Sequence, residues 1–376
     1  MRLKGACVTY AAITGWGKCL PPAVLTNHDL ASILDTSDEW IVSRTGIRER
    51  RISHVGLEEL GYVAAARALA AAGLAGSSVE LIVFGTCSHD DQVPNMASGI
   101  QRRIGAQPAA AYDINTACTS FLYGLSTATA LIRTGVVRNA LVIGAELISP
   151  FMDWADRDVA VLFGDGAAAV VLEASERAEG VLAQKLGCYG DAREILRVQG
   201  MGGRYANRGV LYGVTRWQFE GQEIFRRAVQ GMSSACDDAL AQLNLKADAV
   251  DLVVPHQANL RIIEAVARRT HVPMEKVYLT IQHYGNMSSA TVPVALCDAL
   301  EAGRVRPGAL LMMPSFGGGL SFCAHVVRWG SRTTALNTSA VELPPNDRPG
   351  LEILRACLAR KTRPIATGTT TPFGDA

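Results

Sequence analysis

An internal duplication constrains the fold of this chain of 376 residues more than any other feature of its sequence. Residues 65–86 read as an amphipathic helix, a short turn and a β-branched apolar run, and residues 236–257 repeat that order. Residues 130–146 and 298–314 form a second matching pair, each with a helix end, a glycine, a basic turn and another apolar run. The chain is therefore predicted to contain two copies of one helix–strand–helix–strand module.

Continuous apolar strands that alternate with helices predict an α/β fold with buried, largely parallel sheets. The predicted halves are residues 1–180 and 181–330, followed by a Pro- and Thr-rich extension over residues 331–376. One short helix is expected in the extension, over residues 350–361, and it should end before Pro364. Nothing in the extension suggests chemistry.

Composition and charge narrow the class of protein. With 49% apolar residues, 19% charged residues and a net charge of +1, neither a disordered chain nor a globally basic nucleic-acid-binding protein is expected. No apolar run is long enough to cross a membrane, and the N-terminus lacks a secretory signal. The nine cysteines form no C-x-x-C pair, so no metal site is predicted and a reducing cytoplasm is the expected location.

Cys118 is the first candidate for catalysis. It follows the strand-like run AYDINTA and opens a helical pattern, where the positive end of the helix macrodipole would favour the thiolate. Such a thiolate is a nucleophile suited to acyl transfer. The alternative is an ordinary thiol packed in the core.

His256 and Asn286 are further candidates, from the second copy. His256 follows the apolar run VDLVV, and Asn286 occupies a position close to that of Cys118 in the first copy. Ligands of open α/β sheets bind beyond the carboxyl ends of strands, so the three side chains can meet in one cleft if the copies pack about a pseudo-twofold axis. The alternatives are a loop histidine bonded to a backbone carbonyl and a turn asparagine.

The glycine-rich stretch PSFGGGLSF, residues 314–322, joins two apolar strands. Its glycines allow close backbone approach, so one of them fits an amide donor of an oxyanion hole. A tight bend within a sheet is the alternative.

Six motifs in this order resemble those of β-ketoacyl-acyl-carrier-protein synthase III, a family of the thiolase superfamily. They are DTSDEWIVSRTGIRER (35–50), the segment around Cys118, DWADRDVAVLFGDGA (153–167), PHQANLRI (255–262), GNMSSAT (285–291) and SFGGG (315–319). The resemblance implies a thiolase-like αβαβα fold of five layers, made from two duplicated halves, and a homodimer.

The resemblance also implies a decarboxylating Claisen condensation that initiates fatty acid biosynthesis and needs no cofactor. Cys118 would accept the acyl group of an acyl-CoA, and the backbone N–H groups of Cys118 and Gly318 would hold the oxyanion. Malonyl-acyl-carrier-protein would then bind, and His256 and Asn286 would stabilise the enolate left by loss of CO₂. Phe316 matches a phenylalanine that lines the decarboxylation site.

Other positions match the substrate-binding residues of the family. Trp40 and Arg157 match the pair that sandwiches adenine. Thr36 and Arg44 match residues around the nucleotide end of CoA. The pantetheine tunnel would be lined by Gln222, Phe225 and Asn259. The helix after His256 would dock the acidic carrier protein through Arg261, Arg268 and Arg269.

Val93 stands where short-chain members of the family commonly have a phenylalanine in the wall of the acyl pocket. The smaller side chain predicts an acyl donor longer than acetyl, of medium chain length. Loop 187–210 lies outside the motifs and is expected to line the same pocket. The chain departs from the family pattern at three more positions: Ser120, Ala168 and Gln222.

Three other functions stay open at this point. A related condensing or acyl-transfer enzyme of secondary metabolism could use the same three residues with another substrate. A papain-like peptidase has the same order of Cys, His and Asn, but its signature around the cysteine and a secretory signal are missing. A non-catalytic protein of the same fold is disfavoured because Cys118, His256 and Asn286 are all present.

Overall fold

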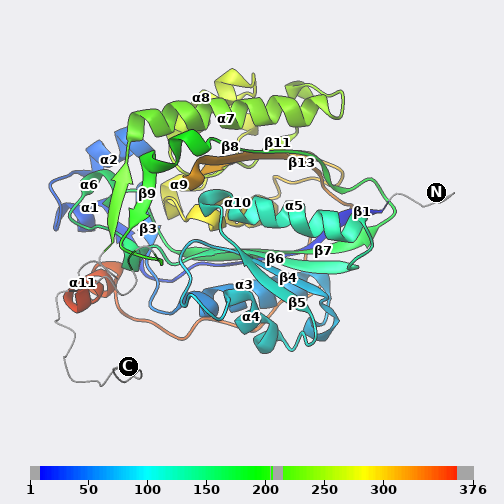
Figure 1. Ribbon diagram of the computed structural model, residues 1–376, viewed down its shortest axis with the longest axis horizontal. Helices are drawn as coiled ribbons and strands as arrows, with labels where there is room; N and C mark the ends of the chain where they lie inside the picture. The colour runs from blue at the N-terminus through cyan, green and yellow to red at the C-terminus, as the bar shows by residue number, and fades with distance from the viewer. Residues whose placement is uncertain (1–8, 204, 206–214, 362–376) are drawn as a thin grey trace, which may run out of the picture.

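Two sheets lie face to face with a layer of helices between them and a layer outside each (Figure 1). The computed structural model describes residues 9–203, 205 and 215–361. The strand order is β5-β4-β6-β7-β1 in the first sheet and β8-β13-β12-β11 in the second. A single parallel pair, Ala11 with Gly180, joins the two sheets at their edges. The strands of the two sheets are β1 (Tyr10–Cys19), β4 (Leu81–Gly85), β5 (Ala110–Ile114), β6 (Asn139–Glu146), β7 (Gly166–Ser175), β8 (Gly180–Cys188), β11 (Leu252–Val253), β12 (Leu310–Gly317) and β13 (Ser321–Arg328).

The helices complete five layers, as the thiolase-like αβαβα prediction requires. Central helices separate the sheets, and other helices cover the outer face of each sheet (Figure 1). In that order the helices are α5 (Ser120–Arg133) and α10 (Thr291–Glu301), α3 (Leu57–Ala72) and α4 (Met96–Ile104), and α7 (Gly221–Ala241) and α8 (Leu260–Arg269). The predicted fold is confirmed.

Alternate residues of the central strands enter two separate cores. On β4, Ile82 and Phe84 pack with α3 in the outer core, whereas Leu81 and Val83 pack with α5 in the core between the sheets. All residues of this strand are buried. Burial on both faces explains why the strand reads as one continuous apolar run.

Both sheets are mixed, so the prediction of largely parallel sheets was wrong. β4 runs parallel to β5 and β6, and β11 runs parallel to β12. β7 and β13, by contrast, run antiparallel to both of their neighbours. The apolar pattern could not distinguish these cases, because helices cover both faces of parallel and antiparallel strands alike.

The duplication is visible in the turns that precede the two central helices. A 3₁₀ turn over residues Ala117–Thr119 leads into α5, and one over residues Ser288–Ala290 leads into α10. Ala117 and Ser288, which begin these turns, both have positive φ angles, of 52° and 45°. Counted from these turns, Asn286 is the counterpart of Asn115 and not of Cys118, which corrects the predicted equivalence.

Smaller elements gather at one end of the two sheets. In Figure 1 they form the group at the left of the layers. They are β2 (Val24–Thr26), α1 (Asn27–Ala31), α2 (Asp38–Thr45), β3 (Glu49–Arg51), α6 (Arg157–Ala160), β9 (Leu196–Gln199), β10 (Arg216–Phe219) and α9 (Ile281–Tyr284).

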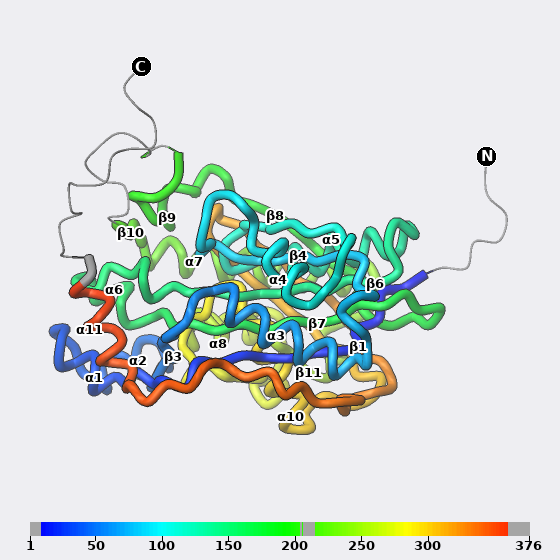
Figure 2. The backbone as a smooth tube through the Cα atoms, turned by 90° about the horizontal axis from the view of Figure 1, so that it is seen from below, coloured from blue at the N-terminus to red at the C-terminus, as the bar shows by residue number. Residues whose placement is uncertain are grey.

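The C-terminal extension packs along the body of the protein. Figure 2 shows residues 331–349 running past α3 to helix α11 (Gly350–Lys361). The backbone N–H of Leu336 donates to the carbonyl of Ala71 at 3.0 Å, so the extension satisfies a carbonyl at the end of α3. Leu354 of α11 is 1% exposed in a core shared with α1 and α2. The helix predicted over 350–361 is confirmed, and Pro364 lies outside the described residues.

Candidate active site

Two cavities meet at Cys118. The larger has a volume of about 910 Å³ and the smaller about 500 Å³. Cys118, Phe163 and Leu196 line both cavities. His256 and Asn286 line the larger one, so the structure brings the three predicted catalytic residues together.

Cys118 sits in the 3₁₀ turn before α5, half-buried at the junction of the cavities. Burial raises the pKa of its thiol to about 12, because the thiolate loses hydration there. A hydrogen bond from Ser288 and the backbone N–H of Cys118 lower that pKa, but by less. The expected thiolate is therefore not the resting form, since desolvation outweighs the helix dipole.

His256 is 2% exposed and follows the short strand β11. Burial lowers the pKa of its imidazole to about 3, so the ring is neutral at physiological pH. Its backbone N–H donates to the Pro314 carbonyl at 2.9 Å, and its Nδ1 lies 2.5 Å from the Thr291 hydroxyl oxygen. The ring is thus held between β12 and the start of α10.

Asn286 is held by its backbone on both sides. Its N–H donates to the Leu162 carbonyl at 2.9 Å, and its own carbonyl accepts from Gly164 at 3.1 Å. Its side-chain oxygen accepts from the Ser288 N–H at 2.8 Å, which leaves the amide nitrogen as the donor end. Gly285 precedes it with a φ of 63°, and a side chain there would meet the Leu162 carbonyl at 2.9 Å.

The glycine-rich turn packs directly on the cysteine. A Cβ at Gly317 would lie 2.7 Å from the backbone nitrogen of Cys118, so only glycine permits this approach. Gly318 lines the smaller cavity beside Cys118. Phe316, 5% exposed, lines the larger cavity with His256 and Asn286. Gly318 therefore lies beside Cys118, with which it was predicted to hold the oxyanion. Phe316 lies beside His256 and Asn286, as expected for a residue of the predicted decarboxylation site.

A buried carboxylate near Cys118, which was not predicted from the sequence, connects the two halves of the chain through hydrogen bonds. Glu146 is fully buried at the carboxyl end of β6. It accepts from the hydroxyls of Ser88 at 2.6 Å and Thr86 at 3.1 Å in the first half. It also accepts from the hydroxyl of Ser288 at 2.9 Å in the second half. The one available signal was a lone carboxylate at the end of the apolar run ALVIG.

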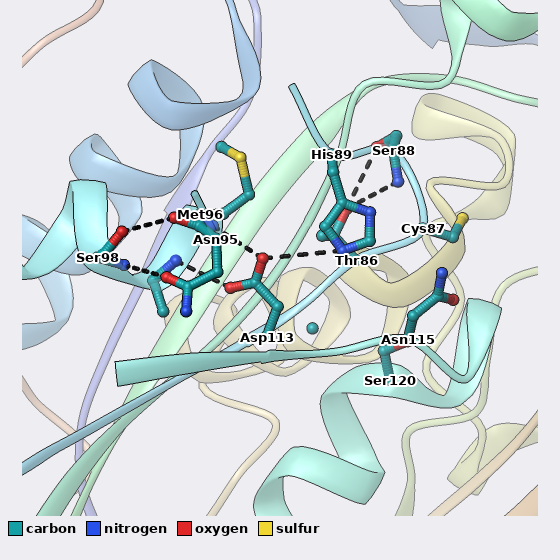
Figure 3. A network of polar contacts seen from close by, with 12 residues as sticks. Thr86, Cys87, Ser88, His89, Asn95, Met96, Ser98, Asp113, Asn115 and Ser120 are labelled. Atoms are coloured by element: carbon teal, nitrogen blue, oxygen red, sulfur yellow. Dashed lines mark hydrogen bonds and ion pairs between the residues drawn. The ribbon is translucent and has the colours of Figure 1, made fainter. Parts of the chain in front are cut away.

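A polar network supports one side of the smaller cavity (Figure 3). Asp113 of β5 accepts from the first two backbone N–H groups of α4, at 2.8 and 2.9 Å, and lies 3.7 Å from the His89 ring. His89 lines the cavity, so this network fixes the segment that follows β4. The lining of this cavity also contains large apolar side chains: Ile148, Phe151, Phe163, Val198, Met201 and Trp217.

Val93 does not line the smaller cavity, contrary to the prediction. Its side chain is 83% exposed, and residues 90–94 are exposed throughout. The preceding residues Asp90, Asp91 and Gln92 do line the cavity, whereas Val93 lies outside its lining. Loop 187–210 does contribute, through Leu196, Arg197, Val198, Met201 and Gly202, while residues 204 and 206–210 lie outside the described residues.

The predicted nucleotide site lies at the mouth of the larger cavity. The Trp40 ring has the guanidinium of Arg157 at 5.0 Å on its face and that of Arg44 at 4.6 Å. Trp40 and Arg44 line the cavity, whereas Arg157 and Thr36 lie outside its lining. The Thr36 hydroxyl is buried without a hydrogen-bond partner among the described residues.

The predicted tunnel and docking residues surround the same entrance. The larger cavity is lined by Gln222, Phe225, Asn259, Arg261 and Arg268. Asn259 also caps α8, because its side-chain oxygen accepts from the Arg261 N–H at 2.9 Å. The Arg261 side chain donates to the Ser43 carbonyl at 2.8 Å and so ties α8 to α2. Arg269 is exposed on α8, outside the cavity lining.

No helix among the described residues is long and apolar enough to span a membrane. Within the same residues, no group of three or more His, Cys, Asp or Glu side chains is placed to hold a metal ion.

The chain matches known proteins over most of its length. Family models for 3-oxoacyl-[acyl-carrier-protein] synthase III and for its C-terminal part match residues 112–190 and 240–329. The chain is 49% identical to β-ketoacyl-[acyl-carrier-protein] synthase III 2 of Vibrio cholerae, over 92% of this chain and 95% of that protein.

Solved structures agree with these matches. The 3-oxoacyl-[acyl-carrier-protein] synthase III of Aquifex aeolicus has a TM-score of 0.80 and 40% identity, over 85% of this chain and all of that one. The priming β-ketosynthase of the R1128 polyketide pathway has a TM-score of 0.83 and 30% identity, over 88% and 99% of the two chains. With its fold and its clustered Cys, His and Asn side chains, the chain belongs to the β-ketoacyl-[acyl-carrier-protein] synthase III family of acyl-transferring condensing enzymes.

Proposed function

We propose that this enzyme condenses the acyl group of an acyl-CoA with malonyl-acyl-carrier-protein, releasing CO₂, in the first condensation of fatty acid biosynthesis. The meeting of two cavities at Cys118 carries the proposal. One cavity suits the arriving thioesters and the other suits the stored acyl chain. A cysteine at the junction can hold an acyl group while the larger cavity exchanges CoA for the second substrate.

In the first half-reaction the Cys118 sulfur attacks the thioester carbonyl and CoA leaves as a thiol, carrying the proton that the cysteine loses. The backbone N–H groups of Cys118 and Gly318 are the proposed donors to the tetrahedral oxyanion. The close approach of Gly317 to Cys118 supports this arrangement, because it brings the two backbone segments together.

In the second half-reaction the malonyl group loses CO₂ and its thioester becomes an enolate. Asn286 and His256 are the proposed donors to the enolate oxygen, and Phe316 covers the same site. The enolate carbon attacks the acyl carbonyl, the bond to Cys118 breaks, and a 3-oxoacyl product forms. A neutral imidazole suits this role, because its hydrogen bond strengthens as negative charge develops.

We still propose a medium-chain acyl donor, but the support is now the size of the smaller cavity and not the side chain at position 93. Val93 lies outside the lining, but the smaller cavity of about 500 Å³ has an apolar wall that includes Ile148, Phe151 and Trp217. That volume falls within the range of pockets that enclose small ligands. An acetyl group would leave most of this wall uncovered.

Residues at the entrance of the larger cavity support a proposal for the second substrate, and membership of the family supports one for the assembly. Arg268 and Arg269 on α8 are the proposed contacts for an acidic carrier protein, and Trp40 with Arg44 and Arg157 for the nucleotide of CoA. A cytoplasmic homodimer without a cofactor is the proposed form, because thioester chemistry supplies both half-reactions. Cys19, Cys236, Cys297 and Cys323 are buried free thiols, as in a reducing compartment.

Intact-mass measurement tests the proposal. The wild-type enzyme is incubated with acyl-CoAs from acetyl to dodecanoyl, beside Cys118→Ala. One acyl adduct is expected on the wild type, formed fastest with a medium chain, and none on Cys118→Ala. Absence of an adduct with every acyl-CoA would overturn the mechanism, and fastest acylation by acetyl-CoA would overturn the chain-length proposal.

Similarity to the R1128 priming β-ketosynthase favours a second candidate, the priming condensation of a polyketide. Both candidates share the acyl-cysteine step. They differ in the carrier protein used, so the acylated enzyme is mixed with malonyl groups on fatty acid and on polyketide carrier proteins. Faster formation of the 3-oxoacyl product on the polyketide carrier would replace fatty acid biosynthesis as the assigned pathway.

A further inference from the structure

Ser288 lies two residues after Asn286 in the turn that leads into α10, and its backbone is strained. Its φ is 45°, in the left-handed region that residues other than glycine rarely adopt. The N–H of Ser288 donates to the side-chain oxygen of Asn286 at 2.8 Å, so the amide nitrogen of Asn286 is the end left to donate. A strained conformation of this kind persists only where its surroundings hold it in place.

The buried carboxylate of Glu146 holds Ser288 from the other half of the chain. Its Oε1 accepts from the Ser288 hydroxyl at 2.9 Å and lies 3.4 Å from the Ser289 backbone nitrogen. Its Oε2 accepts from the hydroxyls of Ser88 at 2.6 Å and Thr86 at 3.1 Å. A carboxylate only accepts, so the Ser288 hydroxyl is the donor in this contact. Glu146 is fully buried and Ser288 is 2% exposed, so bulk water does not compete for it.

The corresponding turn of the first half is held in a different way. Ala117 has a similar φ of 52°, and its N–H donates to the side-chain oxygen of Asn115 at 3.2 Å. The glycine-rich turn packs on this residue, since a Cβ at Gly318 would lie 3.4 Å from the Ala117 Cβ. At the equivalent position of the second half, the side chain is instead a hydroxyl bound by Glu146.

We infer that Glu146 is a positioning residue, which holds Ser288 in its left-handed conformation and so directs the amide nitrogen of Asn286 toward the enolate. The inference rests on the proposed function, in which Asn286 donates to the enolate oxygen. Without the Ser288 N–H in place, the Asn286 amide is free to rotate and to present its oxygen to the developing negative charge, which opposes decarboxylation. Glu146 lies outside the lining of both cavities, so it acts through Ser288 and does not touch the substrate.

Two substitutions of Ser288 separate its conformation from its hydroxyl. Ser288→Ala removes the hydroxyl and keeps a Cβ that disfavours positive φ, whereas Ser288→Gly removes the same hydroxyl and adopts positive φ freely. Each enzyme is first acylated with octanoyl-CoA and isolated, so that the rate of acylation does not enter. Release of ¹⁴CO₂ from labelled malonyl-acyl-carrier-protein is then followed.

Ser288→Ala is expected to release CO₂ about 10- to 100-fold more slowly than the wild type, a smaller effect than outright removal of an oxyanion donor. Ser288→Gly is expected to be faster than Ser288→Ala by about fivefold or more, the factor that corresponds to the strain of a left-handed alanine. Ser289→Ala is the matched control, because it removes a neighbouring buried hydroxyl that donates to the Gly85 carbonyl at 2.8 Å. It is expected to stay within about threefold of the wild type.

Glu146→Met tests the anchor itself, because it removes both acceptor oxygens and keeps an unbranched side chain. It is expected to slow CO₂ release as much as Ser288→Ala does, and adding Ser288→Gly to it is expected to recover part of the rate, because glycine needs no anchor. Acylation of Cys118 is not expected to slow, since the charge of Glu146 raises the pKa of the Cys118 thiol. A purely structural role would lower Tm without this difference between the half-reactions.

Equal CO₂ release by Ser288→Ala and Ser288→Gly would overturn the inference, as would release by Ser288→Ala at the rate of the wild type or of Ser289→Ala. If Glu146→Met does not fold, the comparison of the two Ser288 variants still decides the matter. Failure of wild-type Cys118 to accept any acyl group would instead overturn the proposed function, so the two failures are distinguishable.

Discussion

At the scale of single residues, the environment of Cys118 matters more than its place in the sequence. The thiol stands at the start of a helical segment, where the dipole favours the thiolate, yet burial raises its pKa to about 12. The resting enzyme therefore holds a thiol. In the proposed mechanism, the thiol loses its proton to the leaving group as it attacks the bound thioester.

This pKa predicts the pH dependence of alkylation. At every pH below about 12 the thiolate is the minor form, so the rate of Cys118 alkylation by iodoacetamide should rise about tenfold per pH unit from pH 7 to pH 10. The rate is measured by mass spectrometry of the peptide that contains Cys118, in Cys87→Ser to remove the other thiol of the smaller cavity. A plateau below pH 9 would mean that the thiol has an ordinary or lowered pKa.

At the scale of elements, the C-terminal extension supports the two parts of the molecule that it touches. The Arg332 side chain donates to the Ala71 carbonyl at 2.6 Å at the end of α3, and Arg67 of α3 pairs with Glu342 at 2.5 Å. Farther along, Ile353 and Leu354 of α11 enter the core that contains Ile41 of α2. The extension thus links the outer helix layer to the segment that carries Trp40.

Truncation after residue 330 is expected to lower Tm by about 5–10 °C. Burial of Ile353 and Leu354 alone is worth about 3–6 kcal/mol, and the carbonyls at the end of α3 would also lose their partners. Thermal unfolding is compared with that of a chain ended after residue 361, which keeps every described contact. Equal Tm values for the two truncated chains would show that the extension adds nothing to stability.

At the scale of the whole molecule, three buried titratable groups set how stability responds to acid. Burial lowers the pKa values of His256 and His325 to about 3, so the unfolded chain binds two protons below pH 6.5 that the folded chain does not. Burial raises the pKa of Asp165 to about 6, which has the opposite effect between pH 6 and 3.8. The histidines outnumber the aspartate, so these groups make stability fall as pH falls from 6.5 towards 3.

Replacing one histidine isolates this contribution. The unfolded chain of His325→Asn binds one proton fewer in acid than the unfolded wild-type chain. The difference in Tm between wild type and variant should therefore narrow by about 2 °C per pH unit as the pH is lowered from 6 to 4. The wild type loses stability faster because only it retains this histidine. Thermal unfolding at four or five pH values measures the difference. A gap independent of pH would show that His325 titrates normally in the folded enzyme.

The sequence by itself determined the layered fold and the duplication, and it predicted the three catalytic candidates Cys118, His256 and Asn286. Periodicity and repeats are local properties, so segments 65–86 and 236–257 could be recognised as α3–β4 and α7–β11 without coordinates. The motifs around Cys118, His256 and Asn286 likewise pointed to one site, and the structure places all three beside the larger cavity.

Only the tertiary structure decided strand direction, the acidity of Cys118, the exposure of Val93 and the partners of Glu146 and Thr291. Each depends on atoms far apart in the chain. Desolvation of Cys118 comes from the residues packed around it, and the hydrogen bond between His256 and Thr291 joins segments 35 residues apart in the chain. Residue type and spacing predict which groups take part, whereas burial and contact geometry decide their charge and the direction of their hydrogen bonds.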